Sequence, residues 1–313
     1  MNPSIEKLHT RLCTEVKGSE TAAFELIASI LAGGHVLIEG APGVGKTTLA
    51  KSLATAFASD FQRVQFTPDL LPSDLLGYSM FRQDQQKFEF IEGPVFTNLL
   101  LADEINRTSP RIQSALLECM NEGQVTIDGK TWKLPAMFHV VATQNNRFST
   151  GTFPLPEPQL DRFLTSIEMT LPQPVTQVEM LEYHLSDSNR SRREPIASID
   201  DAIRWKEEVH ALKVSRAICE YIVRLSEAVR KNREIEAGLS NRATIALTRM
   251  AQAVAWLHGH SAVFPDDVKR AFVPVLAHRL HPSQSDFGSK DRSFQRRNTI
   301  ALLNAVLDQV EVD

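Results

Sequence analysis

Residues 40–47 have the types and spacing of a phosphate-binding loop. They read GAPGVGKT, which matches the pattern GxxxxGK[ST], and they lie between a short apolar run and a helix-like run. In such a loop the backbone N–H groups and the positive end of the following helix face phosphate oxygens, and the lysine neutralises their charge. We therefore predict that this loop and the next residue bind a nucleotide. The predicted contact residues are Gly40, Ala41, Pro42, Gly43, Val44, Gly45, Lys46, Thr47 and Thr48.

An acidic pair at the end of an apolar run supplies the next candidate groups. Asp103 and Glu104 follow the run NLLLA, far enough beyond the phosphate loop for a strand and a helix to intervene. A carboxylate at such a strand end can hold Mg²⁺, usually through water, and a second carboxylate can orient and deprotonate an attacking water. We therefore expect Thr47 and Asp103 to ligate Mg²⁺ and Glu104 to act as the general base.

Phosphoryl transfer also needs polar and cationic groups around the phosphates. Asn145 ends the run VVATQN and is suited to hydrogen-bond the γ-phosphate or the attacking water. Arg162 in EPQLDRFL and Arg242 in LSNRATIAL are the arginine candidates, because a guanidinium is always charged and presents a planar fork to phosphate oxygens. Position alone does not separate these two arginines from surface arginines in salt bridges.

The elements that must position these groups alternate between strands and helices. Short strands are predicted for HVLIEG, FQRVQF, NLLLADEI and MFHVVATQN, and helices for KTTLAKSLATAFA and PRIQSALLECMNEG. Residues 1–34 also have apolar residues at near-helical spacing. This alternation predicts an α/β fold with a mainly parallel sheet flanked by helices.

Two segments interrupt that alternation. GQVTIDGKTWKLP predicts a β-hairpin with Asp128 and Gly129 as its turn, and FEFIEG, which follows a polar turn, is a candidate for a second hairpin. After LPQP at residues 171–174 only helical patterns follow. We therefore expect an α/β nucleotide-binding domain over residues 1–173 and an all-helical domain over residues 174–313.

The composition is that of an ordinary globular protein, with 313 residues of which 42% are hydrophobic. The formal net charge of -4 gives no overall attraction to polyanions, so nucleic-acid binding would need a local basic patch. Three widely spaced cysteines indicate neither a disulfide framework nor a zinc site, and we expect buried thiols. The sequence has no apolar signal core and no apolar run of membrane-spanning length, so we expect a cytoplasmic protein.

Taken together, the motifs resemble the MoxR family of AAA+ ATPases, in the clade with a hairpin inserted into helix 2. The resemblance covers nearly the whole chain and implies a P-loop AAA+ core with β-hairpin inserts and a C-terminal all-α lid. It also implies an ATP hydrolase that uses ATP and Mg²⁺, assembles into a ring, usually a homo-hexamer, and remodels protein substrates. Its usual partners contain von Willebrand factor A domains. The segments that carry the resemblance are GAPGVGKT, QFTPDLLPSDLLG, GPVFTNLLLADEINR, QSALLECMNEGQVTIDG, ATQN, GTFPLPEPQLDRFL, NRA and VLAHRL.

The resemblance further implies roles for single residues. Asn146 stands where many relatives have proline, so either of Asn145 and Asn146 is a candidate for the nucleotide contact. Arg242 is a candidate for action on its own subunit's nucleotide or on the neighbour's. The implied roles are Walker A for residues 40–47, Walker B for Asp103 and Glu104, sensor 1 for Asn145, the arginine finger for Arg162 and sensor 2 for Arg242.

Two other motors of the same clade are alternatives, a magnesium-chelatase-like subunit and a helicase-type nucleic-acid motor. FTPDLLPSD and GTFPLPEPQLDRF are more similar to MoxR than to the chelatase. The hairpin segments carry few basic residues, which disfavours nucleic acid as a partner. Their aromatic residues Tyr78, Phe81, Phe88 and Trp132 either grip a protein substrate or pack the hairpins.

Overall fold

The computed structural model describes residues 2–145, 153–186, 194–235, 239–281 and 292–312. Its strands are β1 (Val36–Gly40), β2 (Phe61–Gln65), β3 (Gly77–Arg82), β4 (Lys87–Glu92), β5 (Leu99–Asp103), β6 (Gln124–Ile127), β7 (Lys130–Lys133), β8 (His139–Gln144) and β9 (Thr165–Met169). Its helices are α1 (Pro3–Glu15), α2 (Glu20–Leu31), α3 (Lys46–Ala56), α4 (Pro72–Leu76), the 3-10 turn η1 (Ile105–Arg107), α5 (Pro110–Glu122), α6 (Glu157–Leu160), α7 (Pro174–Ser186), α8 (Ile199–Ala211), α9 (Arg216–Lys231), α10 (Asn241–His258), α11 (Pro265–Leu276) and α12 (Arg292–Gln309).

A five-stranded sheet forms the centre of the fold, in the order β2-β5-β8-β1-β9, and every neighbouring pair is parallel. The four predicted strands are β1, β2, β5 and β8, so the α/β prediction is confirmed. Strands β1, β5 and β8 are buried along their whole length, which explains the apolar runs VLI, LLLA and VVA that they contain. Because the strands are parallel, the phosphate loop after β1, the acidic pair at the end of β5 and Asn145 after β8 meet at one edge of the sheet.

Strand β9 was not predicted, because its sequence TSIEM carries polar residues on one face. Ser166 and Glu168 lie on that face, and both contact Arg296 of α12. The same guanidinium forms an ion pair with Glu39 of β1 at 2.5 Å, and Ser166 donates to Glu39 at 2.9 Å. A buried polar network between the strand and a distant helix therefore replaces the apolar pattern of a core strand.

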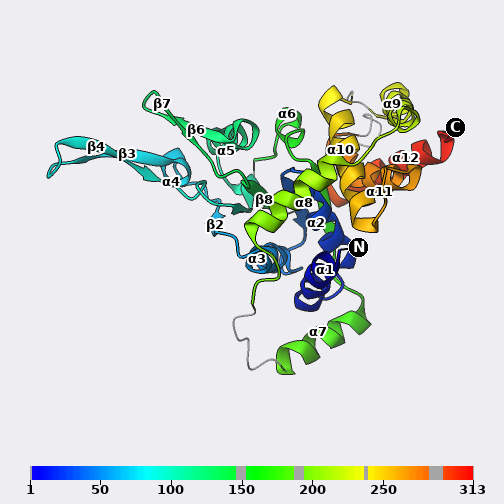
Figure 1. Cartoon of the computed structure of the whole chain (residues 1–313), viewed down its shortest axis with the longest axis horizontal. Coiled ribbons are helices and arrows are strands. Elements are labelled where there is room, and N and C mark those ends of the chain that lie inside the picture. Colours follow the sequence, from blue (N-terminus) through cyan, green and yellow to red (C-terminus); the bar gives the residue numbers. More distant parts are fainter. Residues whose placement is uncertain (1, 146–152, 187–193, 236–238, 282–291, 313) are drawn as a thin grey trace.

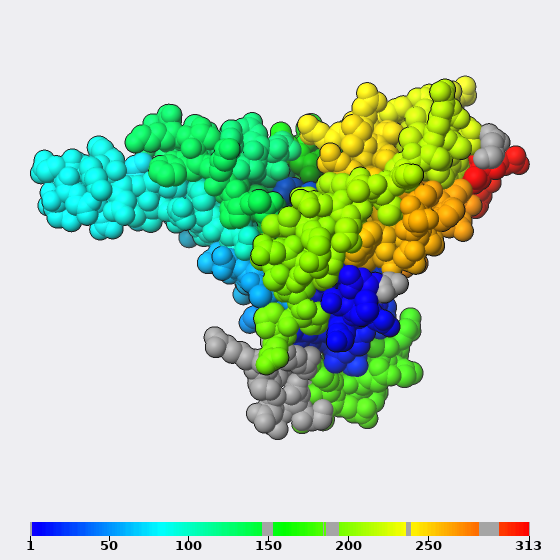
Figure 2. Space-filling model, in the orientation of Figure 1, coloured from blue at the N-terminus to red at the C-terminus, as the bar shows by residue number. Residues whose placement is uncertain are grey.

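The two hairpins project from the body as one arm (Figures 1 and 2). Strands β3 and β4 pair in the longer hairpin and β6 and β7 in the shorter one, whose predicted turn at Asp128 and Gly129 is confirmed by their positive φ angles of 51° and 74°. The two hairpins contact each other where Phe90 stacks on Trp132, with ring centroids 4.5 Å apart. The arm is thus one composite element rather than two separate fingers.

The part of the chain after β9 is helical in the ranges that the structure describes. Helix α7 lies beside α1, whereas α8 and α10 contact α2 and α11 contacts β9 (Figure 1). Helices α9 and α12 pack against α11 and against each other. One buried hydrophobic cluster runs from α1 and β1 through α10 and α11, so residues on both sides of position 173 share a core. Among the described helices, none has the length and apolar character to cross a membrane.

The cysteine prediction is wrong at one position. Cys119 is buried and Cys13 is half-buried, but Cys219 is exposed. Helix α9 buries Ile218, Tyr221 and Ile222 on one face, and Cys219 falls outside that face. An apolar residue next to a core position of a helix can therefore itself be exposed.

Candidate nucleotide and ATP hydrolysis site

The phosphate loop joins β1 to α3 through a backbone that requires glycine at two positions. Gly43 and Gly45 have φ angles of 83° and 93°, in the left-handed region that side chains disfavour. A Cβ on Gly45 would also lie 2.9 Å from Cγ1 of Val16, which follows α1. The loop glycines thus serve both the turn itself and the close packing of α1 against it.

Lys46, the first residue of α3, is only 8% exposed and points back across the loop. Its Nζ donates hydrogen bonds to the carbonyl oxygens of Gly40 at 2.7 Å and Ala41 at 2.9 Å, and to Oδ1 of Asn145 at 3.1 Å. Burial lowers the pKa of Lys46, and the charges of Asp103 and Glu104 oppose that shift. The ammonium group is therefore held between three oxygen acceptors at the edge of the sheet where a phosphate would lie.

Asp103 is the last residue of β5, and both oxygens of its carboxylate accept hydrogen bonds. Oδ1 accepts a hydrogen bond from the Thr143 hydroxyl at 2.6 Å, and Oδ2 accepts one from the Thr47 hydroxyl at 3.3 Å. Arg63 of β2 forms an ion pair with Oδ2 at 2.7 Å. The Thr47 hydroxyl and the Asp103 carboxylate are hard oxygen donors of the kind that Mg²⁺ prefers, so their adjacency fits the predicted ion.

Glu104 adopts a left-handed backbone conformation, with φ 57°, which turns the chain sharply after β5. Its backbone N–H donates to the Thr143 hydroxyl at 2.9 Å, which holds the turn against β8. Its carboxylate accepts three hydrogen bonds, each of 2.9 Å, from Asn145, Gln65 and Arg107. The predicted base is thus fixed in direction by groups from β2, η1 and the end of β8.

A cavity of about 530 Å³ opens beside the phosphate loop. Its walls come from α1, from the loop and α3, and from the segment that begins α7. The apolar side chains Val16, Leu171, Met180 and Tyr183 line this cavity, and no sequence motif marked them. Their place next to the loop suits the base and ribose of a nucleotide whose phosphates lie on the loop.

Family comparisons agree with this geometry. The ATPase family associated with various cellular activities (AAA) matches residues 35–165, and the AAA lid domain matches residues 227–297. The chain is 38% identical to the chaperone MoxR1 of Mycobacterium tuberculosis, over 88% of this chain and 76% of that protein. The chain belongs to the MoxR family of AAA+ ATPases.

Two further relatives support the assignment over the full length. The uncharacterized protein YeaC of Bacillus subtilis is 40% identical over 100% of this chain and 96% of its own length. A crystal structure of a candidate ATPase from Cytophaga hutchinsonii superposes with a TM-score of 0.87 and 36% identity, covering 99% of this chain and 95% of that one. The AAA+ fold predicted from the motifs is confirmed, and this MoxR-family protein binds nucleotide and hydrolyses ATP.

The two candidate arginines of this MoxR-family chain have different surroundings. Arg162 is half-buried and donates from Nη1 to the carbonyl oxygen of Leu117 in α5 at 2.9 Å. Arg242 is exposed in the first turn of α10. Within the described ranges, neither makes a hydrogen bond or ion pair to the loop. Asn146, the alternative to Asn145, lies outside the described residues.

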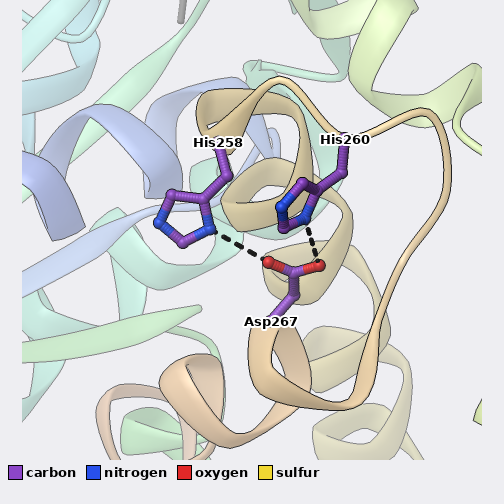
Figure 3. Close-up of side chains that lie close together, drawn as sticks. All are labelled: His258, His260 and Asp267. Carbon is purple, nitrogen blue, oxygen red and sulfur yellow. Dashed lines mark hydrogen bonds and ion pairs between the residues drawn. The ribbon is translucent and has the colours of Figure 1, made fainter.

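A separate group of potential metal ligands lies where α10 turns into α11 (Figure 3). Nδ1 of His258 and Nδ1 of His260 each lie 3.0 Å from a different oxygen of Asp267. The Asp267 carboxylate also accepts a hydrogen bond from the backbone N–H of Phe264 at 3.0 Å. These hydrogen bonds satisfy a carboxylate that is only 1% exposed. We therefore interpret the group as one that stabilises the turn between α10 and α11.

Proposed function

We propose that this MoxR-family protein is a Mg²⁺-dependent ring ATPase that couples ATP hydrolysis to the remodelling or maturation of partner proteins. The observation that carries the proposal is the position of Asn145. Its amide contacts Lys46 at 3.1 Å and Glu104 at 2.9 Å, so the phosphate-binding lysine and the base belong to one hydrogen-bonded set. Groups placed in advance around the reacting phosphate stabilise the transition state without reorganising.

Each side chain of this set has a distinct task in the proposal. Lys46 neutralises phosphate charge, while Thr47 and Asp103 hold Mg²⁺, which when bound supplies further positive charge. Glu104 orients the attacking water and accepts its proton. Asn145 hydrogen-bonds the γ-phosphate or that water, which makes it the sensor asparagine.

In the proposed ring, arginine side chains supply further positive charge to the phosphates of each nucleotide. We assign Arg162 as the finger that reaches the neighbouring subunit's nucleotide, and Arg242 as the lid arginine, acting in cis or in trans. Support for Arg162 is that, among the described contacts, its guanidinium bonds the Leu117 carbonyl oxygen and not the chain's own phosphate loop. Support for Arg242 is its exposed position in the first turn of α10. We further propose a cytoplasmic homo-hexamer whose nucleotide-binding unit spans residues 1–173 and whose lid spans residues 174–313.

The arm is the proposed substrate-facing element. Tyr78, Phe81 and Phe88 are 48%, 45% and 69% exposed, and the last two pair across the hairpin with ring centroids 5.2 Å apart. Trp132, by contrast, is half-buried against Phe90. We therefore propose that the three exposed aromatics contact a protein substrate, delivered by or part of a von Willebrand factor A domain partner, and that Trp132 braces the arm.

Dilution tests the shared-site proposal. ATPase activity per subunit is measured across protein concentrations, with Mg²⁺ and with EDTA, while sedimentation reports the assembly state. We expect activity to require Mg²⁺ and to fall as the assembly dissociates, because the finger acts across an interface. Constant activity per subunit at concentrations where the protein is monomeric would overturn the proposal.

A further inference from the structure

Asp161 lies at a junction between the sheet and the C-terminal helices. It directly precedes Arg162, in the segment that leads from α6 into β9. Its carboxylate accepts a hydrogen bond from Nε of Arg279 at 2.9 Å, just after α11. It also accepts a hydrogen bond from the hydroxyl group of Ser240, whose Oγ lies 3.1 Å and 3.2 Å from the two carboxylate oxygens. One carboxylate thus joins the segment of the proposed finger to two helices of the lid.

Residues just after α11 also form hydrogen bonds with the backbone of the segment that follows Arg162. Arg279 is 7% exposed and donates to the carbonyl oxygens of Phe163 at 2.7 Å and Leu164 at 3.4 Å. The buried ring of His278 lies with Nε2 3.1 Å from the same Phe163 oxygen. Burial lowers the pKa of Arg279 to about 10, and the charge of Asp161 opposes this shift, so the guanidinium remains charged at neutral pH. The chain on the C-terminal side of Arg162 is therefore fixed to α11 rather than free to move alone.

Ser240 connects the same carboxylate to the start of α10. Its Oγ accepts a hydrogen bond from the backbone N–H of Ala243 at 3.1 Å, as the N-cap of that helix, and its proton is thereby available to Asp161. Arg242 lies in the first turn of the same helix, close enough that its charge contributes to lowering the pKa of Arg279. A shift of this helix end therefore acts directly on the residue that precedes Arg162.

We propose that Asp161 is a positioning residue that couples the start of α10, with Arg242, to the placement of Arg162. The proposal rests on the proposed function, because it takes Arg162 as the finger offered to the neighbouring subunit. When the lid moves over the subunit's own nucleotide, the contacts of Asp161 with Ser240 and Arg279 carry that movement to the finger. The state of one site thereby sets the activity of the next site around the ring.

The test is placed on Ser240, because Asp161→Asn would leave a buried guanidinium without its carboxylate and destabilise the fold itself. Ser240→Asp keeps a strong N-cap acceptor for α10 but removes the hydroxyl donor and sets a second negative charge against Asp161. Ser215→Asp is the matched control, since Ser215 caps α9 with φ -70° and ψ 160°, against -73° and 157° for Ser240. Ser240→Thr keeps both the cap and the hydroxyl donor.

We expect Ser240→Asp to lower kcat at least about tenfold, with a smaller change in the KM for ATP, because a misplaced finger weakens the transition state more than substrate binding. Because the second carboxylate repels Asp161, the Tm of Ser240→Asp should lie somewhat below that of Ser215→Asp, and kcat is therefore measured well below both Tm values. Ser240→Thr should retain most of the activity. An equal loss of kcat in Ser240→Asp and Ser215→Asp would overturn the proposal, because it would show that the contacts of Asp161 do not act on the finger.

A double-mutant cycle then separates this inference from the finger assignment. If Ser240→Asp acts through Arg162, it should cause little further loss of kcat in an Arg162→Ala background. Full additivity would overturn the coupling while leaving the finger role intact. If Arg162→Ala alone left kcat unchanged, the finger assignment itself, and with it the proposed shared site, would fail.

Discussion

Asn145 donates a hydrogen bond from its side-chain amide to Oε1 of Glu104 at 2.9 Å. The other end of the same amide accepts from Lys46 at 3.1 Å. Asn145 therefore links the lysine that we propose binds phosphate to the glutamate that we propose activates water. The proposed roles of Lys46, Glu104 and Asn145 thus meet at one side chain.

Asn145→Ala should lower kcat by about 10²-fold, because one donor to the transition state and the alignment of Glu104 are lost together. The KM for ATP should change less. Asn98→Ala is the control, since Asn98 directly precedes the start of β5, at the opposite end of that strand, and its side-chain oxygen accepts a hydrogen bond from the backbone N–H of Asp60 at 3.2 Å. Steady-state kinetics of both variants decide the matter, and equal effects would remove the special role of Asn145.

Glu104→Gln should bind ATP with nearly unchanged affinity and hydrolyse it about 10²- to 10⁴-fold more slowly, because the amide cannot accept the proton of water. Glu89→Gln is the matched change, since it weakens an ion pair with Arg82 on the arm and leaves the site alone. Single-turnover hydrolysis and equilibrium nucleotide binding separate the two effects. Normal turnover in Glu104→Gln would show that another group is the base.

Lys46→Ala should weaken ATP binding by about 2 kcal/mol, or roughly thirtyfold, because a charge-assisted contact to the phosphates is lost. Lys231→Ala removes an exposed lysine whose ion pair with Glu227 spans 3.7 Å, and it should leave binding unchanged. Calorimetric titration with a non-hydrolysable ATP analogue measures both. Equal affinities for Lys46→Ala and the wild type would contradict the phosphate-loop assignment.

The half-buried His35 predicts a pH-dependent stability. Its Nδ1 accepts from the backbone N–H of Val140 at 3.0 Å, so Nε2 carries the proton and donates to the carbonyl oxygen of Met120 at 3.0 Å. Burial lowers the pKa of His35 to about 4 in the folded state, against 6.5 for the free side chain. The unfolded chain then binds the extra proton, so this contribution to stability is present above pH 6.5 and is lost as the pH falls toward 4.

Urea unfolding at pH 7.5 and pH 5 tests this directly. In the wild type the single site should lower the free energy of unfolding by about 2 kcal/mol between these pH values, in addition to the contributions of other groups. His35→Gln should show a drop that is smaller by that amount, whatever its absolute stability. An identical drop in both proteins would mean that His35 is not held neutral.

The sequence was most informative where one local segment does one task. The loop around Lys46, the pair at the end of β5 and Asn145 were each predicted from contiguous residues, because parallel strands bring their carboxyl ends to one edge. Arg63 and Gln65 were missed although their strand was predicted. Their roles depend on the pairing of β2 with β5, and the order of strands in a sheet cannot be predicted from the residues of one strand.

The junction at Asp161 was missed for a related reason. Its partners Arg279 and Ser240 are far along the chain, and each is an ordinary polar residue at a helix end. VLAHRL contributed to the family resemblance, but only the fold shows that its arginine is buried against the segment that carries Arg162. Long-range polar pairs of this kind leave no periodic signal in the sequence.

A mixing experiment tests the central claim, that the active site is shared between subunits. Glu104→Gln and Arg162→Ala subunits are prepared separately, each nearly inactive, and combined under conditions where differently tagged copies co-purify. A 1:1 mixture should regain about a quarter of the wild-type ATPase activity, since about one interface in four then joins an intact Glu104 to an intact Arg162. A co-assembled mixture that stays as inactive as its components would contradict the account.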